Sequence, residues 1–586
     1  MRKQVKLLAG VAMAVALGCG LAGCGKQTTP AGEAAQGSAA TSAAPDWPKF
    51  VDEWIESDMK ANPNDATYLG RHDYIGLFPD WSDAGLKAET QRLKDFRARA
   101  TAFDAAKIDA SAAYERDYLV AVIDGRLFWL ETADWPHKNP TFYGFDPTVY
   151  LDRPYADLAR RMQDYSRWAS NVPAAAAQVK ANLKGPLPKA WIDIGMHTFG
   201  PLGDFLKTDV VKVFADVKDP ALRAEFDKQN AAAAAALADL QKHLESLRAT
   251  QTDAFPMGAD LFAKMLYANE RVDTPLAELE QIGLADMKRN QAALKQACAK
   301  YAPGKTLRQC TDKASADKPA NNDTVAEARR QLVELKRFIE EKGVVTIPGT
   351  QDAKVKQSPP YNSQNSAYID PTPPFDPTMP AFYNVSAPDP TWSKAKQLAY
   401  VQGKTDLLFT SVHEVWPGHF LQFLHTNALK SPLPKAYIGY AYAEGWAHYA
   451  EEMMWEEGLG NGDPEVQIGM LGNALKRNAR FLSAIGLHTK GMTLEQSRKL
   501  FLDEAYQNEG ESEQQAARGA YDPEYLNYTM GKLMIRRLRS DWCATHGGAD
   551  SKPCWRQFHD AFLDHGGPPI PLVRGAMMNE PAKSVF

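Results

Sequence analysis

The segment His413-Glu414-Val415-Trp416-Pro417-Gly418-His419 holds the residues of this chain that are best suited to chemistry. Two imidazoles that converge can bind zinc, and a glutamate beside the first can take a proton from a water that the zinc activates. His413 and His419 are therefore candidate zinc ligands, and Glu414 is the candidate general base. Together they indicate a zinc-dependent hydrolase.

The spacing of the two histidines does not allow a regular helix to bring both rings together. They are six residues apart, and on an unbroken helix six residues advance by about 600°, which leaves the two rings about 120° apart. Pro417 lacks an amide hydrogen and Gly418 tolerates unusual dihedral angles. We therefore expect a helix that bulges by two residues at this point and so brings both rings to one face.

A catalytic zinc usually has three protein ligands, and Glu444 is the candidate for the third. It lies in an apolar and aromatic segment from Tyr437 to Trp455, where a carboxylate is costly unless something positive meets it. A salt-bridged carboxylate in a helical core is the alternative. We expect Glu451 and Glu452 to lie on a solvated face, and His448 to be a packed core histidine rather than a partner of the metal ligands.

Helical signals dominate the sequence around these motifs. Thr324-Val325-Ala326-Glu327 predicts a capping box that opens an amphipathic helix ending before Gly343. Two further helices are predicted to begin at Asp219-Pro220 and Thr274-Pro275, each with a capping residue before a proline. The prediction is a mainly α protein: a large helical body with a deep channel and a few short strands.

The composition changes between Gly343 and Thr391, where ten prolines occur. Short β-like pieces are predicted at 344–347 and 382–386. A long irregular segment inside a folded body often serves a site, and this one leads to the histidine motif. We expect it near the channel wall, between an N-terminal helical region at 46–342 and a C-terminal catalytic region at 392–586.

The N-terminus has the features of an export signal. An apolar run from Leu7 to Leu21 follows basic residues, and Leu21-Ala22-Gly23-Cys24 resembles a bacterial lipobox. We expect 1–23 to be removed, Cys24 to carry a lipid, and 24–45 to be a flexible tether to the membrane. The alternatives are a simple signal peptide or a short membrane anchor. Gly25, with no Asp after the cysteine, favours the outer membrane, with the protein facing the periplasm.

The remaining cysteines agree with export. Of the six cysteines, Cys19 falls in the leader and Cys24 takes the lipid, which leaves 6 − 2 = 4. They form two local pairs, Cys298 with Cys310 and Cys543 with Cys554, and we expect two disulfides in an oxidising compartment. A four-cysteine metal site is the alternative, but no CxxC spacing favours it.

Charge excludes one class of partner. The chain of 586 residues has 67 Lys+Arg and 72 Asp+Glu, without the basic surplus of a nucleic-acid-binding protein. We therefore expect no nucleic-acid partner. Oligomeric state is not indicated.

The two motifs together resemble the DUF885 family of bacterial proteins, which carries HExxPGH followed by EGWAxYxE and is usually grouped with zincin-like metallopeptidases. The resemblance covers nearly the whole mature chain. It is carried by HEVWPGHFLQ at 413–422, AEGWAHYAEE at 443–452, ANPNDATYLG at 61–70, PPFDPTMPAFYNVS at 373–386, GLH at 486–488, YDPEYLNYTMGKL at 521–533 and FHDAFLDHGGPP at 558–569.

The resemblance implies His413, His419 and Glu444 as metal ligands and Glu414 as the general base. It also implies catalytic roles for three residues, any of which could donate to the oxyanion of a tetrahedral intermediate: His488, Arg518 and Tyr528. One position departs from the family, because members often have an Asp where this chain has Ala484.

The predicted function is hydrolysis of short or unfolded peptides by a zinc enzyme tethered to the cell envelope. Two alternatives share the motif. One is a lipid-tethered binding or scaffold protein that holds the metal without turnover, and the other is a metal-dependent hydrolase of a non-peptide amide or ester.

Overall fold

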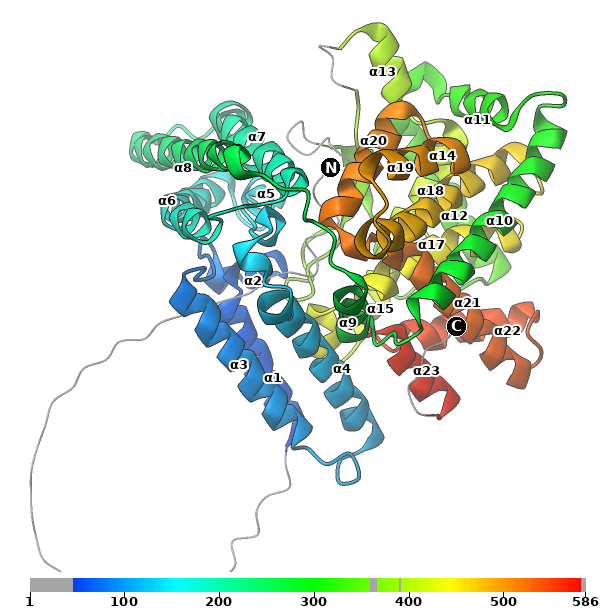
Figure 1. Ribbon diagram of the computed structural model, residues 1–586, viewed down its shortest axis with the longest axis horizontal. Helices are drawn as coiled ribbons and strands as arrows, with labels where there is room; N and C mark the ends of the chain where they lie inside the picture. The colour runs from blue at the N-terminus through cyan, green and yellow to red at the C-terminus, as the bar shows by residue number, and fades with distance from the viewer. Residues whose placement is uncertain (1–45, 359–365, 389–391, 581–585) are drawn as a thin grey trace, which may run out of the picture.

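Helices make up most of this protein, as the sequence predicted. The computed structural model in Figure 1 describes residues 46–358, 366–388, 392–580 and 586. The predicted leader, the lipid attachment point Cys24 and the tether lie outside the described residues. None of the described helices is both long enough and apolar enough to cross a membrane.

The N-terminal half consists of helices that gather in two groups. These helices are α1 (Trp47–Ala61), α2 (Pro63–Tyr68), α3 (Asp83–Thr101), α4 (Ala110–Leu127), α5 (Thr148–Asp152), α6 (Leu158–Asn182), α7 (Lys189–Val213), α8 (Pro220–Ser246) and α9 (Ala259–Glu270). Helices α3 and α4 pack together, and α8 packs on both α6 and α7 (Figure 1). The predicted start of α8 is confirmed, since the Asp219 carboxylate accepts hydrogen bonds from the amides of Ala221 and Leu222.

Three helices lead from this half toward the irregular segment. They are α10 (Leu276–Tyr301), α11 (Leu307–Ala316) and α12 (Thr324–Lys342). The predicted capping box at Thr324 is wrong by one residue, because Asp323 caps α12 by accepting from the amide of Ala326. Helix α10 likewise begins one residue after the predicted first-turn proline, with Pro275 as its N-cap.

The segment between α12 and the C-terminal helices contains a small sheet. Its strands are β1 (Lys354–Gln357), β2 (Ala367–Asp370) and β3 (Phe382–Val385). The order is β1-β3-β2, with β3 parallel to β1 and antiparallel to β2. The strand predicted at 382–386 is confirmed. The strand predicted at 344–347 is wrong, because Thr346 binds the Asp560 carboxylate through both its amide and its hydroxyl instead of pairing with another strand.

The C-terminal region contains the motif helices. They are α13 (Lys394–Tyr400), α14 (Lys404–Glu414), α15 (His419–Ala428), α16 (Leu433–Ala436), α17 (Tyr440–Glu456), α18 (Pro464–Thr489), α19 (Leu494–Lys499), α20 (Glu509–Tyr521), α21 (Asn527–Thr545), α22 (Lys552–Leu563) and α23 (Ile570–Met578). Helix α17 packs on α14, α15 and α21, and α18 packs on α10 and α14.

Glycines allow α17 and α21 to approach closely. A Cβ atom at Gly531 would lie 2.0 Å from the Ala441 carbonyl oxygen, and one at Gly445 would lie 2.5 Å from the Gly531 Cα. Any larger residue would therefore push the two helices apart. This contact fixes α17, which carries Glu444, against α21, which carries Tyr528.

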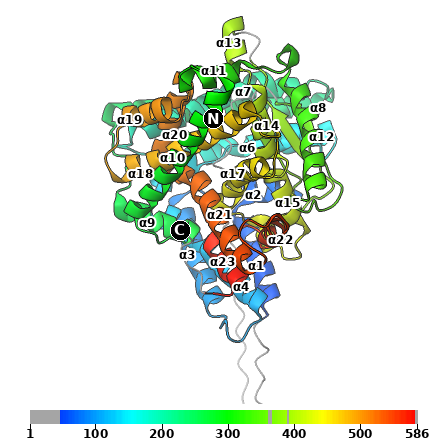
Figure 2. The ribbon, with the colours of Figure 1, turned by 90° about the vertical axis from the view of Figure 1, so that its right-hand side faces the viewer.

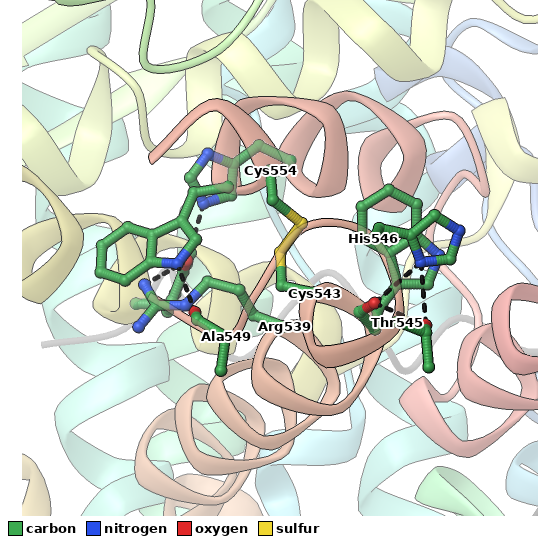
Figure 3. Close-up of a disulfide and its surroundings, with 10 residues drawn as sticks. Arg539, Cys543, Thr545, His546, Ala549 and Cys554 are labelled. Carbon is green, nitrogen blue, oxygen red and sulfur yellow. Dashed lines mark hydrogen bonds between the residues drawn. A yellow bond between two sulfur atoms is a disulfide. The ribbon is translucent and has the colours of Figure 1, made fainter. Parts of the chain in front are cut away.

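Both predicted disulfides are present. Cys298–Cys310 joins α10 to α11, and Cys543–Cys554 joins α21 to α22. Figure 3 shows the second bond, with Arg539 of α21 on one side and His546 on the other. Each disulfide closes a short local loop, so it staples neighbouring helices rather than distant parts of the chain.

The two halves share one hydrophobic core, which includes the fully buried Trp54, Trp168, Trp416 and Trp446. Hydrogen bonds also cross between the halves: the Tyr114 hydroxyl of α4 donates to the His565 carbonyl at 3.1 Å. Figure 2 shows α17 and α21 of the C-terminal half in front of α2 and α6 of the N-terminal half. Helices far apart in the sequence also pack on each other, as α7 does on α20 and α4 on α23.

Candidate metal centre

The histidine motif forms two helices rather than one bulged helix, which corrects the expectation from its spacing. Helix α14 ends at Glu414 and α15 begins at His419. The turn between them is closed by the Gly418 amide, which donates to the Val412 carbonyl at 2.9 Å. A Cβ at Gly418 would lie only 1.8 Å from the His413 carbonyl oxygen, so glycine is required here.

Helix α17 holds this turn in place. The Trp446 indole nitrogen donates to the Pro417 carbonyl at 2.8 Å, and Trp446 is fully buried. Because Glu444 lies two residues before Trp446 on the same helix, the contact that fixes the turn also fixes the position of Glu444 relative to the two histidines.

The three predicted metal ligands converge on one point. His413 Nε2 lies 3.2 Å from Glu444 Oε2, and His419 Nε2 lies 3.3 Å from the same oxygen. The ligand atoms of the three residues all lie within 4.8 Å of one another. His413, His419 and Glu444 are only 3%, 8% and 6% exposed, so bulk water does not separate them.

This donor set fits a transition metal. Zinc binds imidazole nitrogen and carboxylate oxygen at about 2.0 to 2.2 Å, so donors at the corners of a tetrahedron are about 3.3 to 3.6 Å apart. The two distances to Glu444 Oε2 are close to that value. Two imidazoles and one carboxylate also match the ligand types of known catalytic zinc sites. The group formed by His413, His419 and Glu444 could therefore bind a metal ion.

Glu451 belongs to this site, although the sequence placed it on a solvated face. That expectation is wrong: Glu451 is 1% exposed, and its Oε1 lies 2.8 Å from His413 Nδ1. Arg477 of α18 donates from Nη1 to Glu451 Oε2 at 2.9 Å. An Nδ1–H that donates to Glu451 leaves the Nε2 lone pair of His413 free to bind a metal.

The charges at this point favour a cation. Burial and Arg477 both act to lower the pKa of His413, but the hydrogen bonds to Glu444 and Glu451 outweigh them and raise it to about 9. Burial acts to raise the pKa of Glu444, but the charge of His419 and the hydrogen bonds from both histidines hold it well below its usual range. An environment that stabilises positive charge on an imidazole also suits a metal ion.

Glu414 faces the same point from the end of α14. Its Oε2 accepts a hydrogen bond from the Ile369 amide of β2 at 3.1 Å, so the predicted crossing segment orients the candidate base. Burial is the main cause that raises the pKa of Glu414, and the charge of Glu444 raises it further, while the two histidines oppose the shift. A carboxylate with a raised pKa is well suited to accept and return a proton near neutral pH.

Tyr528 reaches the centre, and Arg518 lies behind it. The Tyr528 hydroxyl donates to Glu444 Oε1 at 3.0 Å. Arg518 lies 5.8 Å from the Tyr528 ring centroid and donates to the Tyr440 hydroxyl at 2.8 Å. His488 has other neighbours: its Nε2 lies 2.7 Å from the Gly519 carbonyl, and its ring stacks on Phe262.

Two other residues of the second motif have structural partners. Glu452 is 5% exposed and not solvated as predicted; it pairs with Arg289 at 2.6 Å and with Arg536 at 2.8 Å. His448 is buried in the helical core, as expected. The two acids that follow EGWAHYA therefore point to different sides of α17: Glu451 contacts a metal ligand, and Glu452 pairs with arginines of neighbouring helices.

A cavity of about 330 Å³ opens beside the metal ligands. Its wall includes Glu414, His419 and Glu444 from the C-terminal region, helices α2 and α4 from the N-terminal half, and 368–371 of the crossing segment. The expectation that this segment lies near the wall of a channel is therefore met by these residues. Both halves of the chain therefore contribute to the wall of this cavity.

Sequence reasoning missed Glu451 and Arg477, and for Glu451 a signal was present. It follows Glu444 by seven residues, or about two helical turns, which places both on one face of α17. No pattern in the sequence links Arg477 or the Ile369 amide to the motif, because each comes from a separate element.

Two solved structures illustrate the similarity of this fold to known proteins. The chain is similar to "a putative lipoprotein of unknown function" from Shewanella oneidensis, with a TM-score of 0.76 and 23% identity, covering 91% of this chain and 100% of that one. It is also similar to "the putative lipoprotein from Colwellia psychrerythraea", with a TM-score of 0.72 and 17% identity, covering 91% and 96%. These likenesses show a shared fold.

Comparison with curated proteins gives no match. The family described as "Bacterial protein of unknown function (DUF885)" matches residues 63–577, which include every element of the candidate metal centre. The chain therefore belongs to the DUF885 family.

Proposed function

We propose that this protein is a metal-dependent peptidase. The observation that carries the proposal is the convergence of His413, His419 and Glu444 on one buried point, with a cavity whose wall includes Glu414, His419 and Glu444. A site with metal-ligating residues, a base of raised pKa and room for a substrate has the parts that hydrolysis requires.

Each residue of the site has its own role in the proposed reaction. His413, His419 and Glu444 would hold the metal, for which zinc fits best; when bound, it would act as a Lewis acid toward a carbonyl and toward water. Glu414 accepts a proton from the attacking water and returns it to the departing amine. Glu451 and Arg477 orient His413, and the Tyr528 hydroxyl, which donates to Glu444 in the structure, would donate to the oxyanion during the reaction.

The burial of the site supports small or extended substrates. The ligands are less than a tenth exposed, so a folded protein could not bring a peptide bond to them. A short or unfolded peptide could enter the cavity, which has more apolar than polar surface and carries a few polar groups near the metal ligands. We infer that peptides of this kind are the substrates.

We also propose that the protein acts in the cell envelope, tethered through a lipid on Cys24. Support comes from the lipobox-like sequence before Cys24, the two disulfides, and relatives described as putative lipoproteins. Labelling of expressing cells with a fatty acid should tag the full chain but not Cys24→Ser. Equal labelling of both would contradict the anchor.

The substitution Glu414→Gln tests the peptidase proposal. It keeps the size of the side chain and removes the base, so cleavage of a peptide mixture should fall at least about a hundredfold while bound metal stays stoichiometric. Glu334→Gln, which changes an exposed carboxylate on α12, is the matched control and should keep full activity.

Three outcomes would count against the proposal. Full activity in Glu414→Gln would remove the base assignment. Bound metal with no cleavage of any peptide would favour a lipid-tethered binding or scaffold protein. Turnover restricted to non-peptide amides or esters would keep the chemistry and replace the substrate class.

A further inference from the structure

Glu270, the last residue of α9, has one carboxylate oxygen that accepts hydrogen bonds and one that accepts none from the described part of the chain. It is 1% exposed. Its Oε1 accepts hydrogen bonds from the Ala441 amide at 2.9 Å and from Asn527 Nδ2 at 3.2 Å. Its Oε2 is buried, and no described residue forms a hydrogen bond with it. Buried carboxylate oxygens are rarely left so, which calls for an explanation.

The hydrogen bonds of Oε1 account for one carboxylate oxygen of Glu270 but not for the other. Ala441 lies in the first turn of α17, and the N-cap of that helix is Gly439, which has no side chain to accept from the free amides. Glu270 Oε1 supplies that acceptor from another helix. A glutamine could do the same, so capping alone does not require a charge.

Glu270 also differs from other acids of the cavity wall. Asp58 pairs with Arg126 and Arg92, Asp152 pairs with Lys356, and Asp370 pairs with Arg153. Glu270 is in the same wall, yet no described Lys, Arg or His forms an ion pair with it. These three acids have their counter-charge within the protein, whereas none of the described residues supplies one to Glu270.

A buried carboxylate without a counter-charge is unfavourable, and here the neighbourhood adds to the cost. Burial raises the pKa of Glu270 to about 8, although the nearby backbone amides of Ala441 and Tyr440 act to lower it. Burial together with the charges of Glu270 and Asp522 also raises the pKa of Glu524 well above its usual range. A cation brought into the cavity at this point would relieve both acids.

The position of Glu270 indicates how far a bound cation would lie from the metal ligands. Ala441, which Glu270 binds, lies three residues before Glu444 on α17, a rise of about 4.5 Å along the helix. A residue of an extended peptide spans about 3.3 to 3.6 Å. Along the axis of α17, the amide that Glu270 binds and the ligand Glu444 are therefore offset by little more than one peptide residue, and Glu270, His419 and Glu444 line the same cavity.

We propose that Glu270 binds the α-ammonium group of the substrate, so that the enzyme acts on peptides with a free N-terminus and cleaves within their first few residues. The proposal rests on the peptidase function proposed above and adds the feature by which substrates are selected. Oε2 accepts the ammonium hydrogen bonds, while Oε1 continues to cap α17.

Binding to an inactive protein tests this without turnover. The probes are tetra-alanine amide with a free N-terminus, the same peptide acetylated, and an acetylated peptide with lysine in first place. On metal-loaded Glu414→Gln protein, the free peptide should bind at least about tenfold more tightly than either acetylated one. Adding Glu270→Gln, which retains an acceptor for Ala441, should bring the ratio close to one, whereas adding Asp152→Asn should leave it unchanged.

Metal content and melting temperature of the Glu270→Gln protein should match its parent, which separates substrate binding from folding. Equal binding of the free and acetylated peptides would overturn the proposal, and so would a ratio that survives Glu270→Gln. Tight binding of the acetylated lysine peptide would assign the site to a side-chain ammonium instead.

Cleavage by the wild-type protein separates the two proposals. Equal cleavage of free and acetylated peptides would end the N-terminal assignment and leave the peptidase intact. A strong preference in binding, with no cleavage of any peptide, would end the peptidase and leave Glu270 as an ammonium site.

Discussion

His413 illustrates how much of this centre depends on side chains outside the first motif. One ring nitrogen faces Glu444, and the other lies 2.8 Å from Glu451, which Arg477 holds in turn. A carboxylate that accepts from the far nitrogen of a metal-binding histidine fixes the tautomer and the orientation of the ring. We therefore expect metal affinity to depend on Glu451 although it is not a ligand.

Replacing Glu451 with glutamine tests this dependence. Removing the charge leaves Arg477 unpaired and weakens the hold on His413, so metal affinity should fall by about 10- to 100-fold in competition with a chelator. Glu452→Gln is the matched control on the next residue; it breaks pairs with Arg289 and Arg536 and should lower stability but not metal affinity. Unchanged chelator resistance in Glu451→Gln would show that His413 does not need this partner.

Tyr528 allows a similar test of transition-state stabilisation. Tyr528→Phe removes the hydroxyl that donates to Glu444 and keeps the ring that faces His413. Losing one oxyanion donor typically lowers kcat by about 10²- to 10³-fold, so we expect a loss of that order when both proteins are fully loaded with metal. The measurement is steady-state kinetics with a peptide. A change in KM alone would assign Tyr528 to binding.

At the scale of elements, the break between α14 and α15 replaces the regular helix of an HExxH site. In HExxH the histidines are four residues apart, and here they are six apart. On a straight helix this longer spacing would turn the second histidine away from the first. The turn resets the direction of the chain, and α17 secures it through Trp446 and the contact of Gly445 with Gly531. The geometry of the ligands is therefore a property of three helices and one turn.

Gly418→Ala should disrupt that turn. The new Cβ would lie 1.8 Å from the His413 carbonyl oxygen, so the backbone must shift and His419 must move with it. We expect a loss of roughly 1 to 3 kcal/mol in stability and of most bound metal, measured by denaturant unfolding and metal analysis. The control is Gly472→Ala in α18, where nothing lies within 4 Å, and it should change stability by less than about 1 kcal/mol. Normal metal content in Gly418→Ala would contradict the role of the turn.

For the whole molecule, the sequence was sufficient to predict local features. The mainly α fold, the start of α8, the β3 strand and both disulfides follow from capping, composition and spacing, which act over short stretches of chain. Convergence of His413, His419 and Glu444 was expected and agrees with the structure. The capping box at Thr324 failed by one residue because Asp323, just before it, also has a side chain that can cap.

Features set by contacts between distant elements could not be predicted in the same way. Glu451 and Glu452 look like a polar end of a helix until α18, α10 and α21 supply arginines to meet them. Glu270 lies 171 residues from the amide that it caps. These contacts join separate elements, and no local pattern of residues predicts them.

The amount of metal bound by the purified protein tests the central claim most directly. After reconstitution with zinc and removal of excess, the wild-type protein should hold one zinc per chain, and His419→Ala should hold much less than one while keeping the melting behaviour of the metal-free parent. A wild-type protein that binds no zinc or other divalent metal, or a His419→Ala protein that keeps one per chain, would contradict the assignment of His413, His419 and Glu444 as the metal centre.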